Sequence, residues 1–487
     1  MDAMRVAMRQ ARLPPSAARA RPNGPGLHVT DRRPLSYHLR RTLALALPIM
    51  VARSAILVMA AVDTVMTGWA GARELAYLGL GSAPMVTLMI VSIGALQATI
   101  VLVAQAVGAG EDAKVGDIWR ASLILALSLG AAVVVLSLIA EPLYLATGQD
   151  PVIAANGAAV SRAFAWGIPG MLLFIATNLT LEAIGRPRVG MFVMLAANLV
   201  NVGLNGIFVL GWLALAEPGG AVAAIATSSF LRWAAFAAVL GYFLIILVRD
   251  GDRFGIFVPA RVWWRQWCAG GGLAGRRIRR MGLPLALTQG VESSAFAAVV
   301  FIAGRLGPDI LAAHQATTTV LSLVFMNAIG MSGATSIRVA RAVGRQRPAD
   351  SLLAGAAGVA LAAALALPFS ALALAAPEAL ARIFVEDAAV IAVARGTMWT
   401  IGWLFAFDAT MGAVLGALRG VADIWVPLAL QAAAFWLFGV PAAWLFAVVA
   451  DLGAAGLWWG VGTGIIVSVA LLVPRFYLVC RRPLARA

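Results

Sequence analysis

Apolar residues occur along this chain in twelve long runs, which short polar segments separate. Each run has roughly 20 residues, the length at which an α-helix crosses a hydrocarbon layer of about 30 Å. The pattern therefore predicts twelve membrane-spanning helices, at 43–67, 82–108, 120–140, 161–181, 190–213, 221–248, 282–304, 310–337, 352–376, 397–418, 425–449 and 453–478.

The basic residues between these runs indicate how the chain is oriented. If the N-terminus is inside, the five inner loops contain 17 Lys and Arg, and the outer loops contain five. Short cytoplasmic loops carry an excess of Lys and Arg, and acidic residues contribute little to this rule. We therefore expect a multi-pass protein of the cell inner membrane with both termini cytoplasmic.

A set of small and apolar residues recurs at a constant spacing of 236 positions. The matches include Leu47-Pro48 with Leu283-Pro284, Gly68 with Gly304, and Gly108 with Gly344. Each repeat holds six predicted helices, and parallel repeats of this kind commonly enclose a central site. The sequence thus predicts an all-α membrane protein, with twelve transmembrane helices in two six-helix repeats around a central cavity.

The repeats also define the expected domain boundaries. Residues 1–41 are rich in Arg, Pro and Gly without an apolar period, which indicates a disordered cytoplasmic tail. We expect an N-lobe at 42–248, a basic cytoplasmic linker at 249–281, and a C-lobe with a short cytoplasmic tail at 282–487.

Composition agrees with a membrane protein and excludes other classes. The chain is 62% hydrophobic and 12% charged, about half the charged share of a soluble domain. The net charge of +15 is dispersed in short clusters, so we expect membrane lipid rather than nucleic acid as the partner. Cys268 and Cys480 fall in predicted cytoplasmic segments, where a disulfide is not expected. Because phosphate-binding loops, metal-ligand clusters and nucleophile triads are missing from the sequence, we expect neither an enzyme nor a cofactor, and not transport driven by ATP.

Three acidic residues lie well inside predicted spans, namely Asp63, Glu292 and Asp408. A carboxylate at the bilayer centre costs about 2.5–3.5 kcal/mol on insertion scales. A structural role is one explanation, with the carboxyl bonded to a neighbouring helix or paired with Arg53 or Arg232. The alternative is a proton- or cation-binding group that faces the interior.

Depth groups Asp63 with polar residues of two other helices. Asn201 and Asn205 are one helical turn apart in the outer half of the fifth span, and Thr227 lies near the outer start of the sixth. We predict that these four side chains meet and bind a proton or Na⁺, with Na⁺ coordinated by Asp63, Asn201 and Asn205. Asparagines can also hold helices together without binding an ion.

Several motifs, in this order and at these helix positions, resemble the multidrug and toxic compound extrusion (MATE) family, in its NorM-type branch. The resemblance covers about Leu43 to Arg482. It rests on VDTVMTGWAG at 62–71, AQAVGAG at 104–110, NVGLN at 201–205, PLALTQGVESSAFA at 284–297, LAAHQ at 311–315 and DATMGAVLGALRGVAD at 408–423.

The resemblance implies a two-lobed transporter that exports cationic amphiphilic drugs by antiport with H⁺ or Na⁺. Carried over by residue, the cation or proton site of its N-lobe falls on Asp63, Asn201, Asn205 and Thr227, and the acidic pair of its C-lobe on Glu292 and Asp408. Leu404 departs from the family, which often has a tyrosine one turn before the second of these acids, so a Na⁺ site in the C-lobe is in doubt.

The expected partners are small cationic drug-like substrates and lipid, and we expect a monomer. Candidates for lining the cavity are Gln315, Trp403, Phe405 and Trp436. The last three are aromatic, and aromatic rings stack on flat cations. A flippase for a lipid-linked oligosaccharide, from a related superfamily branch, is the main alternative. Such proteins more often carry cationic residues in the cavity for a pyrophosphate, whereas acids dominate the spans here, with Arg53 and Arg232 as the exceptions. A channel or scaffold is a weaker one, because it leaves the buried acids unexplained.

Overall fold

The structure is a computed structural model, and it describes residues 34–212, 217–249, 251–384, 387–482 and 486. The contacts divide the chain into two units, and nearly all described residues belong to the unit Leu35–Ala487. Most of the predicted tail, residues 1–33, lies outside the described residues. Residues 35–41 of that tail are helical, and His38 among them is buried, which corrects the predicted boundary of the tail.

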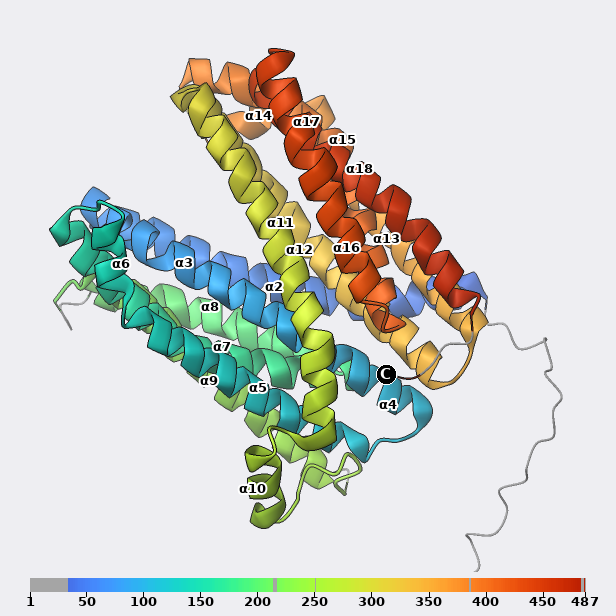
Figure 1. The fold of residues 1–487 in the computed structure, drawn as a ribbon. Coiled ribbons are helices and arrows are strands. Elements are labelled where there is room, and N and C mark those ends of the chain that lie inside the picture. Colours follow the sequence, from blue (N-terminus) through green and yellow to red (C-terminus); the bar gives the residue numbers. More distant parts are fainter. Residues whose placement is uncertain (1–33, 213–216, 250, 385–386, 483–485, 487) are drawn as a thin grey trace, which may run out of the picture. The chain divides into compact units, whose positions relative to one another are not determined.

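The first half of the unit is entirely helical in its regular structure (Figure 1). Its elements are α2 (Leu35–Ala70), α3 (Ala72–Leu96), α4 (Ala98–Ala109), α5 (Lys114–Ser137), α6 (Ala140–Ala146), α7 (Pro151–Ile184), α8 (Arg188–Phe208) and α9 (Gly220–Arg249).

The second half follows after a short helix, α10 (Ala260–Cys268), which lies inside the predicted linker. Its elements are α11 (Gly272–Leu306), α12 (Pro308–Gly344), α13 (Pro348–Ala375), α14 (Pro377–Arg382), α15 (Ala388–Gly420), α16 (Trp425–Ala433), the π-helical η2 (Ala434–Gly439), α17 (Val440–Trp444), the π-helical η3 (Leu445–Val449) and α18 (Gly453–Cys480).

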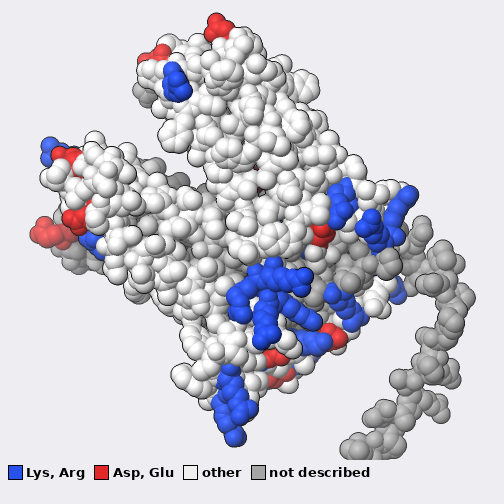
Figure 2. Space-filling model, in the orientation of Figure 1, with Lys and Arg blue, Asp and Glu red and all other residues white. Residues whose placement is uncertain are grey.

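Within the described residues, twelve helical segments are long and apolar enough to cross a membrane, which confirms the predicted twelve spans. Two of them are interrupted: α3 and α4 form one span that breaks at Gln97, and α16 to η3 form another. On the face shown in Figure 2, charged side chains gather toward the ends of the helices and leave the wide middle uncharged. That distribution suits a hydrocarbon layer around the middle, where charges are costly.

The equivalent helices α7 and α15 both begin with an aspartate that caps the helix N-terminus. The Asp150 carboxylate accepts hydrogen bonds from the backbone N–H groups of Val152 (2.9 Å) and Ile153 (3.3 Å) at the start of α7. Asp387 does the same at the start of α15, where it accepts a bond of 2.8 Å from Ala389. An aspartate at this position satisfies N–H groups that have no partner in the helix, so the repeat preserves a helix start as well as a packing pattern.

The two halves form two bundles within this unit, which meet near one end and diverge toward the other (Figure 1). The contacts between bundles join α12 to α2 and α4, and α11 to α3. At this meeting end, α4 and α12 cross at Gly108 and Gly344, which are equivalent in the 236-residue repeat. A Cβ at Gly344 would lie 2.9 Å from Gly108 Cα, and one at Gly108 would lie 2.9 Å from Arg341 Cα. Only glycine lets the two backbones approach this closely.

Candidate functional site

The Asp63 carboxylate is buried in α2 and accepts three side-chain hydrogen bonds. Its side of the helix faces α8 and α9, and the residue is 3% exposed. Asn201 donates to Oδ1 over 3.1 Å and Asn205 over 2.8 Å, both through Nδ2 from α8. Ser228 of α9 donates to Oδ2 over 2.5 Å. The grouping that the sequence predicted for Asp63, Asn201 and Asn205 is thus present in the structure.

The hydroxyl from α9 differs from the predicted one by a single position. Thr227 is buried, but the hydroxyl that bonds Asp63 belongs to Ser228, which also accepts from Asn201 Nδ2 over 3.0 Å. Adjacent residues point about 100° apart around a helix. The hydroxyl that reaches Asp63 is therefore that of the residue next to Thr227.

The third asparagine of the α8 face has a different role. Asn198 donates to the backbone oxygen of Ala55 over 2.9 Å and to that of Met194 over 2.8 Å, so it joins α8 to α2. Asn201 and Asn205 lie further along the same face and reach the carboxylate instead. One polar face thus combines a helix contact with a carboxylate site.

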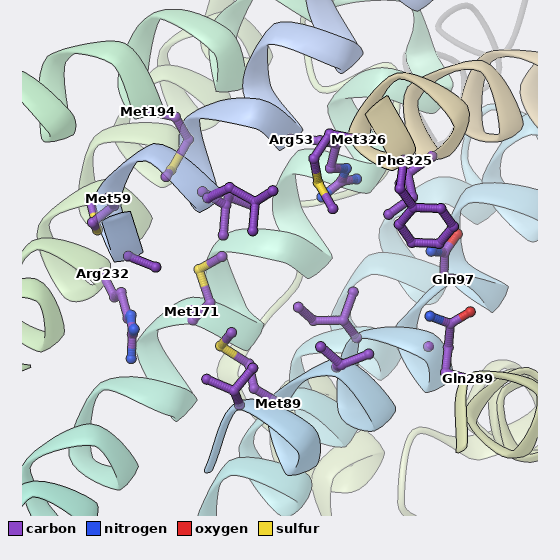
Figure 3. A pocket seen from close by; sticks show the side chains of 18 of the residues that line it. Arg53, Met59, Met89, Gln97, Met171, Met194, Arg232, Gln289, Phe325 and Met326 are labelled. Atoms are coloured by element: carbon purple, nitrogen blue, oxygen red, sulfur yellow. The ribbon is translucent and has the colours of Figure 1, made fainter. Parts of the chain in front are cut away.

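A cavity of about 270 Å³ lies between the two bundles, and Asp63 is on its wall. Figure 3 shows how much of this wall is methionine, with Met59, Met89, Met171, Met194 and Met326 labelled. Met411 also lines it. Methionine is flexible and polarisable and adapts to differently shaped ligands. The wall is therefore suited to apolar compounds of varied shape.

Three arginines and two acids add charge to this wall, namely Arg53, Arg232, Arg419, Asp63 and Glu292. The Arg232 guanidinium lies over the Phe164 ring, with its central carbon 4.2 Å from the ring centre. It interacts electrostatically with Asp63, and its Nη1 has no hydrogen-bond partner among the described residues. A cationic group thus lies close to the buried carboxylate.

A buried ion pair that the sequence did not reveal lies beside the cavity. Glu182 is 1% exposed and its Oε1 lies 3.4 Å from Arg53 Nη2. Asn178, one turn earlier in α7, donates to the same oxygen over 2.7 Å. The predicted fourth span ended at residue 181, whereas α7 continues to Ile184 and carries the acid within it. The polar residues that end the apolar run hid this extension.

The acids of the second half are connected electrostatically across two helices. Glu292 of α11 is half-buried on the cavity wall, and Gln431 of α16 donates to its Oε2 over 3.5 Å. Its carboxylate interacts electrostatically with Arg419 and with Asp408 of α15. Asp408 is 5% exposed and does not line the cavity.

Leu404, one turn before Asp408, is buried and adds no hydroxyl there. Its side chain packs against Gly462 of α18, where a Cβ would lie 3.0 Å from Leu404 Cδ1. The departure that the sequence indicated is therefore a packed apolar contact. The described residues also contain no group of three His, Cys, Asp or Glu side chains that could hold a metal ion.

The four residues predicted to line the cavity lie elsewhere. Gln315 is exposed, Trp403 and Trp436 are 50% and 43% exposed, and Phe405 is buried in the packing of α15. None of the four is on the wall of the central cavity, whose aromatic residues are Phe164 and Phe325. Aromatic character alone did not indicate which face of a helix the residues occupy.

The fold is that of a known class of membrane transporter. A eukaryotic MATE transporter, AtDTX14, superposes with a TM-score of 0.81 at 17% identity, over 92% of this chain and 98% of that one. A structure described as the outward-facing conformation of a multidrug resistance MATE family transporter gives 0.80 at 19%, over 91% and 97%. At these identities the likeness concerns the fold alone.

Sequence comparison identifies the family. The MatE family model matches residues 48–207 and again 284–445, and the two matches start 236 positions apart, the spacing of the repeat. A probable multidrug resistance protein NorM of Deinococcus radiodurans is 32% identical over 446 residues, covering 90% of this chain and 95% of that protein. One of the same name from Bradyrhizobium diazoefficiens is 30% identical over 448 residues, covering 91% and 93%. The chain belongs to the MATE family of transporters.

Proposed function

We propose that this MATE transporter exports cationic amphiphilic compounds in exchange for protons, and that Asp63 carries the proton. The observation that supports this most directly is the buried Asp63 carboxylate, which lies on the wall of a methionine-rich cavity and accepts hydrogen bonds from Asn201, Asn205 and Ser228. The cavity wall accommodates the apolar part of the substrate. The charge on the wall depends on whether Asp63 is ionised.

Competition for Asp63 couples the two fluxes. When Asp63 is ionised, its negative charge attracts a cation in the cavity, and the attraction is strong because little water screens it. When a proton binds, that attraction is lost and the cation leaves. Substrate and proton therefore stabilise different states of the same carboxylate, and each favours a different conformation of the two bundles.

The surroundings of Asp63 favour a proton over Na⁺. Arg232 interacts electrostatically with the carboxylate, and its positive charge repels an ion bound directly to Asp63 more strongly than a substrate cation held further away in the cavity. Asn201 and Asn205 both turn their amide N–H groups toward the carboxylate. Na⁺ requires oxygen ligands, and both amides would have to rotate to provide them.

We assign a second role to the acids of the C-lobe. Glu292 lies on the cavity wall, where it meets the substrate, and its charge acts electrostatically on Asp408 behind it. We expect Glu292→Gln and Asp408→Asn to narrow the substrate range or to uncouple export from the proton gradient.

The orientation in the membrane follows the basic loops. The end where the bundles meet carries the 109–114 and 345–347 loops together with α10, and these segments belong to the basic set of inner loops. We infer that this end and both termini are cytoplasmic, with an N-lobe from α2 to α9 and a C-lobe from α11 to α18. We also infer that the protein acts as a monomer in the inner membrane. The cavity then faces the outside in this structure.

Efflux of a fluorescent cation from proteoliposomes tests the proposal, with a pH gradient and a Na⁺ gradient imposed separately. We expect the pH gradient to drive efflux and the Na⁺ gradient alone to have no effect. Asp63→Asn abolishes transport while the protein elutes as a folded species in detergent, and the matched variant Asp309→Asn, at an exposed acid of α12, transports normally. Wild-type efflux from Asp63→Asn would remove this carboxylate from the mechanism, and efflux driven by Na⁺ alone would replace the proton as the coupling ion.

A lipid flippase is the second candidate, because Arg53, Arg232 and Arg419 all line the cavity. One fold relative, at 19% identity and a TM-score of 0.79, is a transporter from Pyrococcus furiosus whose description reports a binding pocket of reverse polarity. The ion pair between Arg53 and Glu182 reduces the positive charge available here, as do the electrostatic interactions of Arg232 with Asp63 and of Arg419 with Glu292. Binding of a lipid pyrophosphate, measured against binding of a cationic dye, separates the two functions.

A further inference from the structure

The segment between the two halves concentrates positive charge on the surface. Residues 253–281 contain no acidic residue, and α10 and the start of α11 carry six arginines. On the face shown in Figure 2, blue side chains gather on α10 and over the lower end of α11. We call this set the linker basic patch, and it consists of Arg261, Arg265, Arg276, Arg277, Arg279 and Arg280.

The charges of the patch have no ionic partner in the described part of the chain. All six arginines are exposed, and none forms an ion pair with a described acid. Arg276 and Arg280 are four residues apart on one helix, a spacing at which like charges repel. The nearby carboxylate of Glu111 interacts with Arg277 but already pairs with Lys114 at 2.9 Å and Arg486 at 3.7 Å. Among the described residues, the patch therefore has little counter-charge.

One face of α10 is fixed to the first half of the protein. Gln266 accepts a hydrogen bond of 2.7 Å from Arg120 Nε and donates one of 2.8 Å to Asp117, both at the start of α5. The Trp263 ring lies edge-on to Trp119 at 6.3 Å between centres. These contacts hold α10 beside the end of a membrane span.

The remaining surface of α10 is exposed and amphipathic. Trp264 is 70% exposed, and Arg261 and Arg265 lie beside it along the same side of the helix. Leu273, at the start of α11, is 78% exposed. A tryptophan between arginines is typical of helices that lie in the membrane interface. Within the described part of the chain, no residue covers these large apolar side chains.

A sharp turn joins the two parts of this surface. Gly270, Gly271 and Gly272 have φ angles of +58°, +85° and +60°, which residues with a side chain rarely adopt. Arg279 donates a hydrogen bond to the Gly270 carbonyl and so ties the turn to α11. The tryptophan face and the arginines thus belong to one ordered segment between the spans α9 and α11.

We propose that α10 and the first turns of α11 bind the headgroups of anionic phospholipids. Trp264 and Leu273 enter the interfacial layer, and Arg276 and Arg277 hold lipid phosphates, for which the guanidinium fork is well matched. The position of the segment, directly between two spans, brings it to the bilayer surface. Its assignment to the inner leaflet rests on the orientation given under the proposed function.

The thiol of Cys268 makes this site measurable in the full-length protein. Cys268 is exposed at the end of α10 and Cys480 is buried, so an environment-sensitive fluorophore attaches to α10. The labelled protein in detergent is titrated with phosphatidylglycerol and, separately, with phosphatidylcholine. We expect saturable emission changes with phosphatidylglycerol alone, and their half-saturation shifts to higher lipid concentration in high salt.

Matched substitutions separate the patch from charge in general. Arg276→Gln with Arg277→Gln raises the half-saturating phosphatidylglycerol concentration roughly 30-fold, since each arginine near such a surface contributes about fivefold. Arg481→Gln with Arg482→Gln, an equal loss of charge at two exposed residues, leaves it unchanged. Equal shifts in the two double variants, or no shift in either, would overturn the site.

Two further measurements identify the source of the phosphate and separate the lipid-binding proposal from the proposed function. Soluble glycerol phosphate at millimolar concentration is expected not to change the emission; a saturable response would mean a site for free phosphate instead. Asp63→Asn is expected to bind phosphatidylglycerol as the wild type does. If Asp63→Asn abolished lipid binding, the linker basic patch would not be independent of the transport site. If efflux failed while lipid binding stayed intact, only the proposed function would be contradicted.

Discussion

Replacing Gly344 with alanine is expected to open the end at which α4 and α12 cross. A Cβ at this position would lie 2.9 Å from Gly108 Cα and 2.9 Å from the backbone nitrogen of Ala109. Carbon atoms are normally about 3.5–4.0 Å apart at contact, so the new methyl group overlaps backbone on the opposite helix. Because backbone atoms cannot rotate away, the helices must separate.

The size of the effect follows from the cost of overpacking. An added methyl group in a well-packed interior costs about 1–3 kcal/mol, and here the cost applies only while the bundles are packed at this end. The ratio of closed to open conformers is therefore expected to fall by about 5- to 150-fold, at tenfold per 1.4 kcal/mol. Alanine also favours the helix over glycine by roughly 0.8–1.0 kcal/mol, but this gain is the same in both conformers and does not alter the ratio.

Distance distributions from spin labels at Ala113→Cys and Ala349→Cys measure the separation. Both positions are exposed at this end, one in each half, and the native cysteines are first replaced. The control is Gly333→Ala, on the same helix, where a Cβ would meet only Ile49 Cγ2 at 3.7 Å, an ordinary contact. The reasoning is refuted if Gly344→Ala leaves the distances of the wild type, or if Gly333→Ala shifts them equally.

Two other outcomes follow from the site. Ser228→Ala is expected to slow proton-coupled dye efflux by roughly tenfold or more, because a hydrogen bond to a carboxylate contributes about 1.5–3 kcal/mol. The control Thr227→Ala, one position away, should retain the wild-type rate. Equal efflux rates for the two variants would contradict the assignment of Ser228. Glu182→Gln and Arg53→Gln each leave a buried charge without its partner, at a cost of about 3–5 kcal/mol. Both single variants should therefore unfold in detergent at a lower temperature than the wild type. In the double variant the unfolding temperature should recover. Additive losses in the double variant would show that the two charges do not stabilise each other.

The sequence predicted the helices and the repeat because both depend on periodic features of the chain itself. The length of the apolar runs is set by the thickness of the membrane. The spacing of 236 residues is recognisable at positions such as Gly108 and Gly344, where the packing leaves no room for a side chain. Asp63 was grouped correctly with Asn201 and Asn205 because two residues one turn apart in one helix define a face and a depth.

The remainder of the site depends on rotations and contacts that no single helix determines. Ser228 and Thr227 have the same depth, and only the angle at which α9 meets α2 selects the serine. The burial of Glu182 could be predicted only if α7 were known to continue beyond its apolar run. The methionine wall arises where faces of both bundles meet, so no periodicity within one segment indicates it, and the aromatic residues proposed in its place occupy other faces.

The methionine wall is also expected to make the transporter sensitive to oxidants. Oxidation converts a thioether into a polar sulfoxide, so peroxide would turn an adaptable apolar surface into one that rejects hydrophobic rings. Damage of this kind should affect large apolar dyes first and leave proton binding at Asp63 unchanged, which efflux of several dyes before and after peroxide treatment would measure. Methionine sulfoxide reductase should restore the original range, so the breadth of compounds exported would follow the redox state of the compartment that the cavity faces.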